Sequence, residues 1–173
     1  ETAAIGDHSH AEGQDTDAKG QASHAEGRQT VAEGDYSHSE GRYTTANGNC
    51  SHAEGYYSSA SGVESHAEGT STTANGYTSH AEGGYTTVEA SYSHVEGRKN
   101  TISASGCSSH VEGFNNNLKG ARNHIEGMNN TIKDDNIKGS HIEGGNNQYI
   151  FGVYSHIEGY NNECDDATCC HIE

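Results

Sequence analysis

The chain has 173 residues, only 29% of them hydrophobic, and a formal net charge of −16 from 25 acidic and nine basic side chains. This acidic excess opposes binding to the phosphates of nucleic acids, and no apolar stretch is long enough to span a membrane. We therefore expect no nucleic-acid partner and no membrane insertion in this segment.

One motif dominates the chain from end to end. The tetrapeptide His-x-Glu-Gly occurs eleven times, and the sequence stops within a twelfth copy at His171-Ile172-Glu173. Successive histidines lie 14 residues apart up to His94 and 14 to 17 residues apart beyond it. A fixed period with later insertions is typical of stacked repeats. It predicts a single repeat domain over residues 1–173 with about 12 coils, which are regular 14-residue coils to about residue 97 and wider, longer coils over 98–173.

Each coil has an inner period of seven, with a small apolar residue followed two positions later by glycine. A coiled coil is excluded, because its heptads need two large apolar positions and the chain instead contains 23 glycines. Collagen is excluded too, because proline is absent and glycine is not every third residue. The pattern predicts an all-β solenoid, in which each half-turn is a short strand with a glycine corner.

Strand alternation assigns the two faces of each half-turn. In Ser51-His52-Ala53-Glu54-Gly55, alanine falls on one face and His52 with Glu54 on the other. The repeated alanine predicts a very narrow interior, which broadens where the same slot becomes Val95 and Val111 and then Ile125. Asparagine accumulates in the same stretch, where we expect left-handed corners and stacked amide ladders. We expect a protruding loop near residues 133–136.

The block Ser51–Gly55 and its copies resemble the head repeats of YadA-like trimeric autotransporter adhesins, and the segment Thr2–Gly6 is close to that family's core. Similar Ser-His-Ala-Glu-Gly arrays occur in tail-fibre proteins of phages. The resemblance implies a left-handed parallel β-roll with about 14 residues per coil, three of which associate as a homotrimer. It also implies an extracellular location, on a cell or virion surface, and a trimer axis lined by the histidines and glutamates.

The stacked histidines and glutamates are the candidate site. We expect a structural ladder, because an imidazole beside each carboxylate can donate a hydrogen bond when neutral or cancel the charge when protonated. The carboxylates are Glu26, Glu40, Glu54, Glu68, Glu82 and Glu96. The alternative is a metal- or pH-responsive rod, with zinc, nickel or copper bound by this ladder. Its histidines are His24, His38, His52, His66, His80 and His94. We also expect this ladder to tolerate mild acid better than alkaline pH.

The opposite half-coil carries pairs of hydroxyl residues, often after tyrosine. We expect Thr44-Thr45, Ser58-Ser59, Thr72-Thr73 and Thr86-Thr87 to form exposed rows on the outer sheet, beside Tyr43, Tyr57 and Tyr85. Such rows are typical of surfaces that contact a sugar or a protein. The expected partners are therefore other copies of this chain and a host-surface protein or glycan receptor.

Five cysteines leave an odd thiol, and three of them lie in the last coil. Cys164, Cys169 and Cys170 are candidates for a disulfide within or between subunits. No catalytic residues are indicated, because each histidine has the same neighbours and no single position stands out. The sequence therefore predicts no cofactor and no enzyme, but the structural or adhesive head or shaft of an extracellular fibre.

Overall fold

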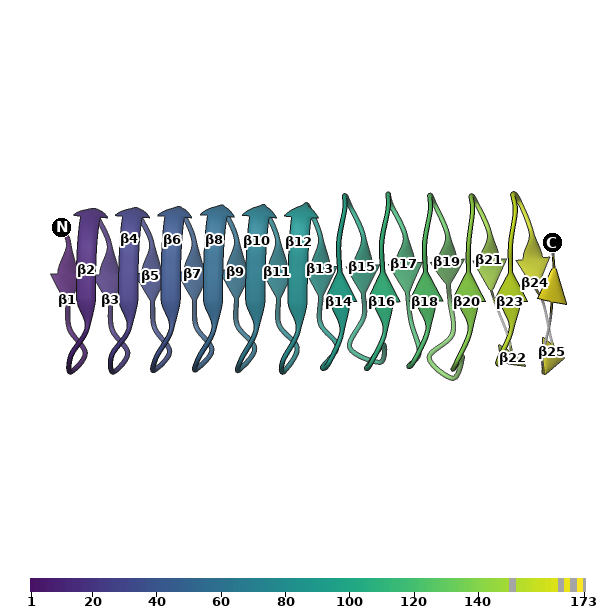
Figure 1. Cartoon of the computed structure of the whole chain (residues 1–173), viewed down its shortest axis with the longest axis horizontal. Helices are drawn as coiled ribbons and strands as arrows, with labels where there is room; N and C mark the ends of the chain where they lie inside the picture. The colour runs from purple at the N-terminus through teal and green to yellow at the C-terminus, as the bar shows by residue number, and fades with distance from the viewer. Residues whose placement is uncertain (150–151, 165–166, 169–170, 173) are drawn as a thin grey trace.

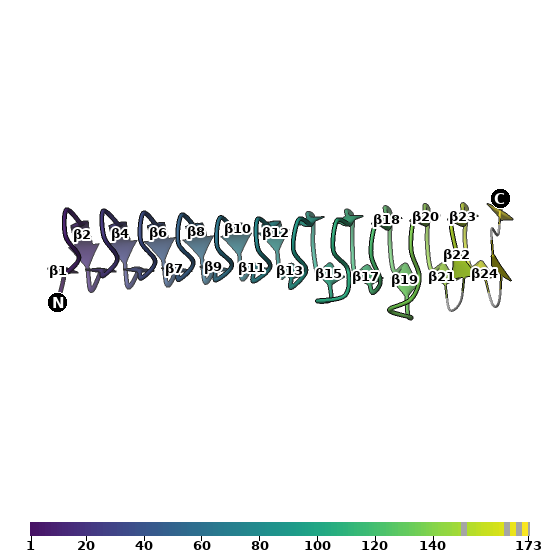
Figure 2. The same ribbon diagram turned by 90° about the horizontal axis from the view of Figure 1, so that it is seen from below.

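The computed structural model describes residues 1–149, 152–164, 167–168 and 171–172. In these residues the chain winds as an elongated stack of coils, and each coil adds one short strand to each of two parallel sheets (Figures 1 and 2). The stack has about 12 turns of roughly 14 residues, which confirms the predicted all-β parallel solenoid. Within the described ranges, no helix is both long and apolar enough to cross a bilayer.

Within the part of the chain that the structure describes, the two main sheets have twelve strands each, and a third sheet has two. The first sheet contains β1 (Ala3–Ala4), β3 (Asp17–Ala18), β5 (Val31–Ala32), β7 (Thr45–Ala46), β9 (Ser59–Ala60), β11 (Thr73–Ala74), β13 (Thr87–Val88), β15 (Thr101–Ile102), β17 (Asn117–Leu118), β19 (Thr131–Ile132), β21 (Gln148–Tyr149) and β24 (Glu163–Cys164). The second contains β2 (His10–Gln14), β4 (His24–Arg28), β6 (His38–Arg42), β8 (His52–Tyr56), β10 (His66–Thr70), β12 (His80–Gly84), β14 (His94–Val95), β16 (His110–Val111), β18 (His124–Ile125), β20 (His141–Ile142), β23 (His156–Ile157) and β26 (His171–Ile172). The short sheet pairs β22 (Gly152–Val153) with β25 (Ala167–Thr168).

Strand pairing keeps equivalent repeat positions in register along the whole second sheet. In the pairing of β10 with β12, His66 lies opposite His80 and Glu68 opposite Glu82. The insertions in later coils leave this register intact, because they fall between strands, and His124 still pairs with His141 across a 17-residue interval. Each motif position therefore forms a continuous row along the long axis.

The interior is as narrow as the alanine pattern predicts. The inward alanines from Ala18 to Ala81 have no exposed surface, and neither do Val95, Ile125 and Ile142 in the same slot further along. One prediction was wrong, because the first residue of each hydroxyl pair is buried rather than exposed. These residues are Thr44, Ser58, Thr72 and Thr86. Alternation explains the error, since the position two before an inward alanine must also point inward.

Glycine after each His-x-Glu is required by a close approach between coils. Gly55 has φ of 99°, and a Cβ placed on it would lie 2.2 Å from the carbonyl oxygen of Gly69. Non-glycine residues take the left-handed conformation elsewhere at the corners, among them Tyr57 (φ 57°) and Asn115 (φ 56°). The predicted left-handed asparagine corners are therefore confirmed.

Asparagine forms two separate ladders in the later coils. The outer one joins Asn115, Asn129, Asn146 and Asn161 through amide-to-amide hydrogen bonds of 2.9, 2.9 and 3.2 Å. The inner one consists of buried residues at the slot that threonine or serine fills earlier. These residues are Asn100, Asn116, Asn130 and Asn147. The amide stacking expected from the sequence is confirmed.

The predicted loop at residues 133–136 is an insertion between β19 and β20 that extends out from the stack (Figure 2). The Asn136 amide donates a 2.7 Å hydrogen bond to Asp134 Oδ1, which closes the turn. Ile137, directly after it, returns to the interior with 1% exposure. The extra residues therefore leave the stacking of the flanking coils unchanged.

Candidate functional site

The second sheet presents histidine and glutamate side by side on its outer face. In β8, Ala53 points into the coil, while the side chains of His52 and Glu54 are 34% and 33% exposed. The same arrangement recurs in each coil of this sheet, because the strands pair in register. The His–Glu ladder is the row of histidines 24, 38, 52, 66, 80, 94, 110, 124, 141, 156 and 171, together with the glutamates two residues after those from His24 to His156.

The imidazole rings of the ladder stack on one another. From His24 onward, successive ring centroids are 4.7 to 5.2 Å apart and the ring planes differ by 1° to 14°. This spacing is about that of neighbouring strands. The first pair differs, because the rings of His10 and His24 meet edge to face at 67°. The predicted line-up of all these histidines is therefore present.

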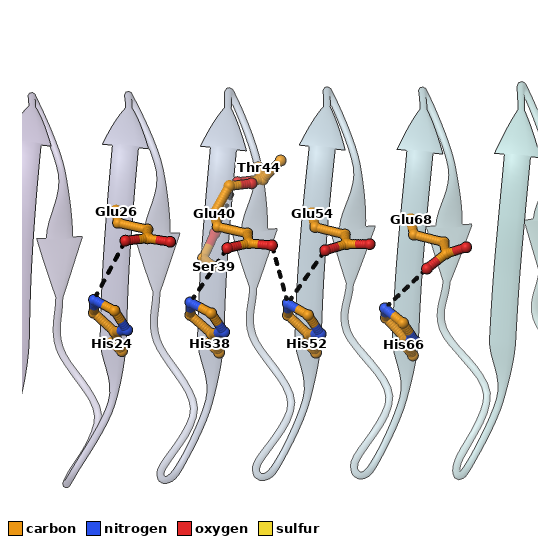
Figure 3. Close-up of polar contacts among 10 residues, drawn as sticks. All are labelled: His24, Glu26, His38, Ser39, Glu40, Thr44, His52, Glu54, His66 and Glu68. Carbon is orange, nitrogen blue, oxygen red and sulfur yellow. Dashed lines mark hydrogen bonds and ion pairs between the residues drawn. The ribbon is translucent and has the colours of Figure 1, made fainter.

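Carboxylates lie on two sides of the histidine nitrogens (Figure 3). The Nε2 atom of His52 is 3.9 Å from Oε2 of Glu54 in its own coil and 3.9 Å from Oε1 of Glu40 in the preceding coil. Glu40 in turn approaches His38 at 3.9 Å through its other oxygen. Similar separations between coils occur at His94 and His110, both 4.0 Å. Glu40 therefore lies between His38 and His52, and Glu82 between His80 and His94.

These separations are too long for hydrogen bonds, which join such atoms at about 2.7–3.2 Å. In the ladder from His24 to His156, the Nε2 atom of each histidine is buried and has no hydrogen-bond partner. Buried polar atoms normally have hydrogen-bond partners. A row of unpaired nitrogens of this length therefore indicates that this face needs a further ligand or partner. The direct hydrogen bond expected from the sequence is therefore absent at the Nε2 atoms from His24 to His156.

At three positions of this face the surroundings favour the neutral imidazole. Burial lowers the pKa of His52 and His80, and neighbouring imidazoles lower it further despite the opposing effect of the nearby glutamates. The pKa of His141 is lowered for the same reasons. Burial opposes ionisation of Glu68, but its contacts with Glu54 and Glu82 and the nearby histidines leave its pKa lowered. The lowered pKa values of these three histidines oppose the expected tolerance of mild acid, which stays a prediction.

A shallow groove runs beside the ladder over the first coils. It is lined by the carboxylates and the close-packed glycines that follow them. These residues are Glu12, Gly13, Glu26, Gly27, Glu40, Gly41, Glu54, Gly55, Glu68 and Gly69. The groove repeats the same chemistry at each coil, so it offers a uniform acidic strip rather than a single distinguished centre.

A second surface feature, missed in the sequence, is a cluster of one arginine and three tyrosines on a corner. Arg42 lies over the ring of Tyr43 at 4.8 Å and over that of Tyr56 at 5.5 Å. Tyr43 and Tyr57 stack at 4.6 Å, and Tyr57 meets Tyr56 edge to face. We call these four residues the Arg–Tyr cluster. The 14-residue spacing of Tyr43 and Tyr57 was the signal that could have revealed it.

The cysteines give no disulfide within the described residues. Cys50 is exposed on a corner, Cys107 is half-buried, and Cys164 is buried at the slot that Tyr149 fills one coil earlier. Cys169 and Cys170 lie outside the described residues, so the predicted pairing among the last three cysteines stays a prediction.

Comparison with known proteins supports the resemblance seen in the motif. Residues 67–88 match the family described as the YadA head domain repeat, in two copies. No curated protein matches the chain. The predicted likeness to YadA head repeats is therefore confirmed for this segment. YadA head repeats suggest the head of a trimeric autotransporter adhesin, a surface-exposed part that is typically structural rather than enzymatic.

Proposed function

We propose that the whole chain, residues 1–173, acts as one structural and adhesive domain in the head or shaft of a trimeric fibre outside the cell. The observation that carries the proposal is the in-register stack of about 12 coils, whose central residues 67–88 match YadA head repeats. A stack of this kind holds a surface at a fixed distance from its anchor and needs no catalytic centre.

The trimer of this proposal packs three left-handed coils side by side through the His–Glu ladder. The unpaired Nε2 atoms support this arrangement, since acceptors from a neighbouring copy would satisfy them. The partial exposure of the ladder also leaves surface for a partner to cover, as with His80 at 35% and Glu82 at 30%. A polar, hydrogen-bonded seam would then replace the apolar seam of the adhesin family.

Mass measurement in solution tests this directly, and a trimer is the expected result. Replacing Glu40 and Glu54 with lysine should shift the mass to that of one chain, because the seam would lose carboxylate acceptors for the imidazole nitrogens and gain ammonium groups that cannot accept. Replacing Glu33 with lysine, an exposed site on the opposite face, is the matched control and should leave the trimer intact. A wild-type chain that stays a monomer at high concentration would contradict the proposal.

The Arg–Tyr cluster supports a receptor-contacting role. It gathers exposed aromatic surface and a guanidinium in a chain whose net charge is −16, with Tyr57 51% exposed. Aromatic faces and arginine together suit a glycan or a protein loop. Replacing Tyr43 and Tyr57 with alanine should weaken binding of the full chain to cell-surface preparations. The same change at Tyr154, exposed on the opposite corner, should not; equal losses would argue against this surface.

A further inference from the structure

The strongest unused chemistry in the molecule is the row of imidazole nitrogens with carboxylate oxygens close by. Eight groups of three or more such side chains have ligand atoms within 4.8 Å of one another, counting the five named and three more among the described residues. One is Glu26, His38 and Glu40, and another is His66, Glu68 and His80. The donor types are those that zinc, cobalt and nickel prefer.

The distances between these donors fit ions better than they fit hydrogen bonds. With bonds of about 2.0–2.2 Å and a tetrahedral angle, two ligands of one zinc ion lie about 3.4 Å apart. Nε2 of His52 is 3.9 Å from an oxygen of Glu54 and 3.9 Å from an oxygen of Glu40. At His66 and Glu68 the separation is 3.6 Å. A small rotation of the glutamate side chains would close the remaining gap.

The ring geometry decides which donors can share an ion. His38 and His52 stack with planes 2° apart and centroids 4.8 Å apart, so their Nε2 lone pairs run parallel and cannot converge. One imidazole per ion is therefore the rule inside the stack, with carboxylates from its own coil and the preceding one. The exception is the first pair, where the rings of His10 and His24 are turned by 67°.

The carboxylates can connect neighbouring ions. Glu40 directs Oε2 to His38 and Oε1 to His52, so each of its oxygens faces a different imidazole (Figure 3). Charged carboxylates stacked at the spacing of neighbouring strands also repel one another. Divalent ions between them would replace this repulsion with attraction.

We propose that the His–Glu ladder is a linear array of sites for zinc-like divalent ions, each held by one imidazole and by carboxylates of two consecutive coils. Water completes the coordination of each ion. All protein ligands come from a single chain, so this array forms without the fibre role or the trimer. An Nε2 atom that binds an ion no longer donates a hydrogen bond to a neighbouring copy. The ions would link successive coils lengthwise, in addition to the backbone pairing.

The test is a titration of the full chain, made without an affinity tag, with Co²⁺ alone. We expect saturable binding with a visible spectrum of nitrogen and oxygen ligands and no thiolate charge-transfer band. The triple variant His38→Gln, His52→Gln, His66→Gln should bind one ion fewer for each imidazole removed. The control His8→Gln, at an exposed corner outside the ladder, should bind as many ions as the unmodified chain. Absence of binding, a thiolate band or an unchanged ion count in the triple variant would overturn the proposal.

A second measurement uses the unmodified chain, in case the triple variant does not fold. Paramagnetic Co²⁺ broadens the magnetic resonance signals of imidazoles that bind it. The ladder imidazoles should broaden at low ion concentrations while the imidazole of His8 stays sharp. Equal broadening of His8 and the ladder would mean adventitious surface binding and would refute the array.

Discussion

The coils of residues 10–84 and those of residues 94–164 stack in the same way but differ in their interior residues and in the length of their strands. We call the first the alanine-filled coils and the second the branched coils, after the Val, Leu or Ile that fills most of their inward slots. Histidine strands β2 to β12 are five residues long in the alanine-filled coils, whereas β14 to β23 are two residues long. Beyond β12 the pairing after glycine continues only as isolated bridges, such as Arg98 with Phe114.

The buried polar slot changes together with the apolar slot. Oγ1 of Thr72 is buried without a partner, and Thr86 makes one hydrogen bond of 3.1 Å to the Glu82 carbonyl. At the same slot Asn116 donates to the carbonyls of Glu112 and Gly127 at 2.7 and 2.9 Å and accepts from the Asn130 amide at 2.8 Å. The longer amide therefore holds three backbone groups where threonine holds one or none, which compensates for the shortened strands.

The largest expected effect tests the close contact between the motif glycines of successive coils, which both regions share. Gly55→Ala and Gly127→Ala should each destabilise the fold by more than about 4 kcal/mol, because the new Cβ would lie 2.2 or 2.0 Å from a carbonyl oxygen of the next coil. Chemical denaturation measures the loss. The control Gly84→Ala meets only Arg98 Cγ at 3.9 Å and should stay within about 0.5 kcal/mol of the unmodified chain. A mild effect at Gly127 would mean that the branched coils stack less closely than the alanine-filled coils.

The second largest effect concerns the apolar side chains that fill the interior of the coils. Ile125→Ala should cost about 2–5 kcal/mol, because it leaves a cavity at a fully buried site in the branched coils. Thermal or chemical unfolding would show it.

The reverse exchange, Ala67→Ile, places a larger side chain in an alanine-filled coil and should cost about 1–3 kcal/mol or more. If Ala67→Ile were neutral, the alanine-filled coils could accept a larger side chain in their interior. Packing would then not explain the difference between the two regions.

A substitution in the buried asparagine ladder should cost less stability than one among the apolar residues of the interior, but more than one at a threonine in the same slot. Asn116→Ala removes three hydrogen bonds and leaves backbone groups unpaired, so we expect a loss of about 1–3 kcal/mol. Thr72→Val is the matched control and should be neutral or slightly stabilising, because the threonine hydroxyl has no partner to lose. Equal losses at both positions would show that the asparagine ladder adds nothing.

The sequence predicted the coil period, the inward alanines and the row of histidines, because each is a direct reading of a periodic pattern. It placed Thr44 and its equivalents wrongly, since they lie beside half-buried residues such as Thr45 and only strict alternation separates the two positions. The Arg–Tyr cluster was missed because it joins residues of neighbouring coils that sequence order separates. The unpaired state of Nε2 depends on side-chain distances of a few tenths of an ångström, which no spacing rule supplies.

The smallest effect is a pH dependence that both regions share. The pKa values of His52, His80 and His141 are lowered in the fold, so below the ordinary histidine range of about 6.5 the unfolded chain binds more protons than the folded one. Stability should therefore fall as pH is lowered from about 7 through that range, and the lowered pKa of Glu68 extends the loss to more acidic pH. The effect is modest because the ladder side chains are about one third exposed. Unfolding measured from pH 8 to pH 5 should show a shallower decline in His52→Gln, His80→Gln than in the unmodified chain or in His8→Gln. A stability that rises on acidification would mean that carboxylate attraction outweighs desolvation after all.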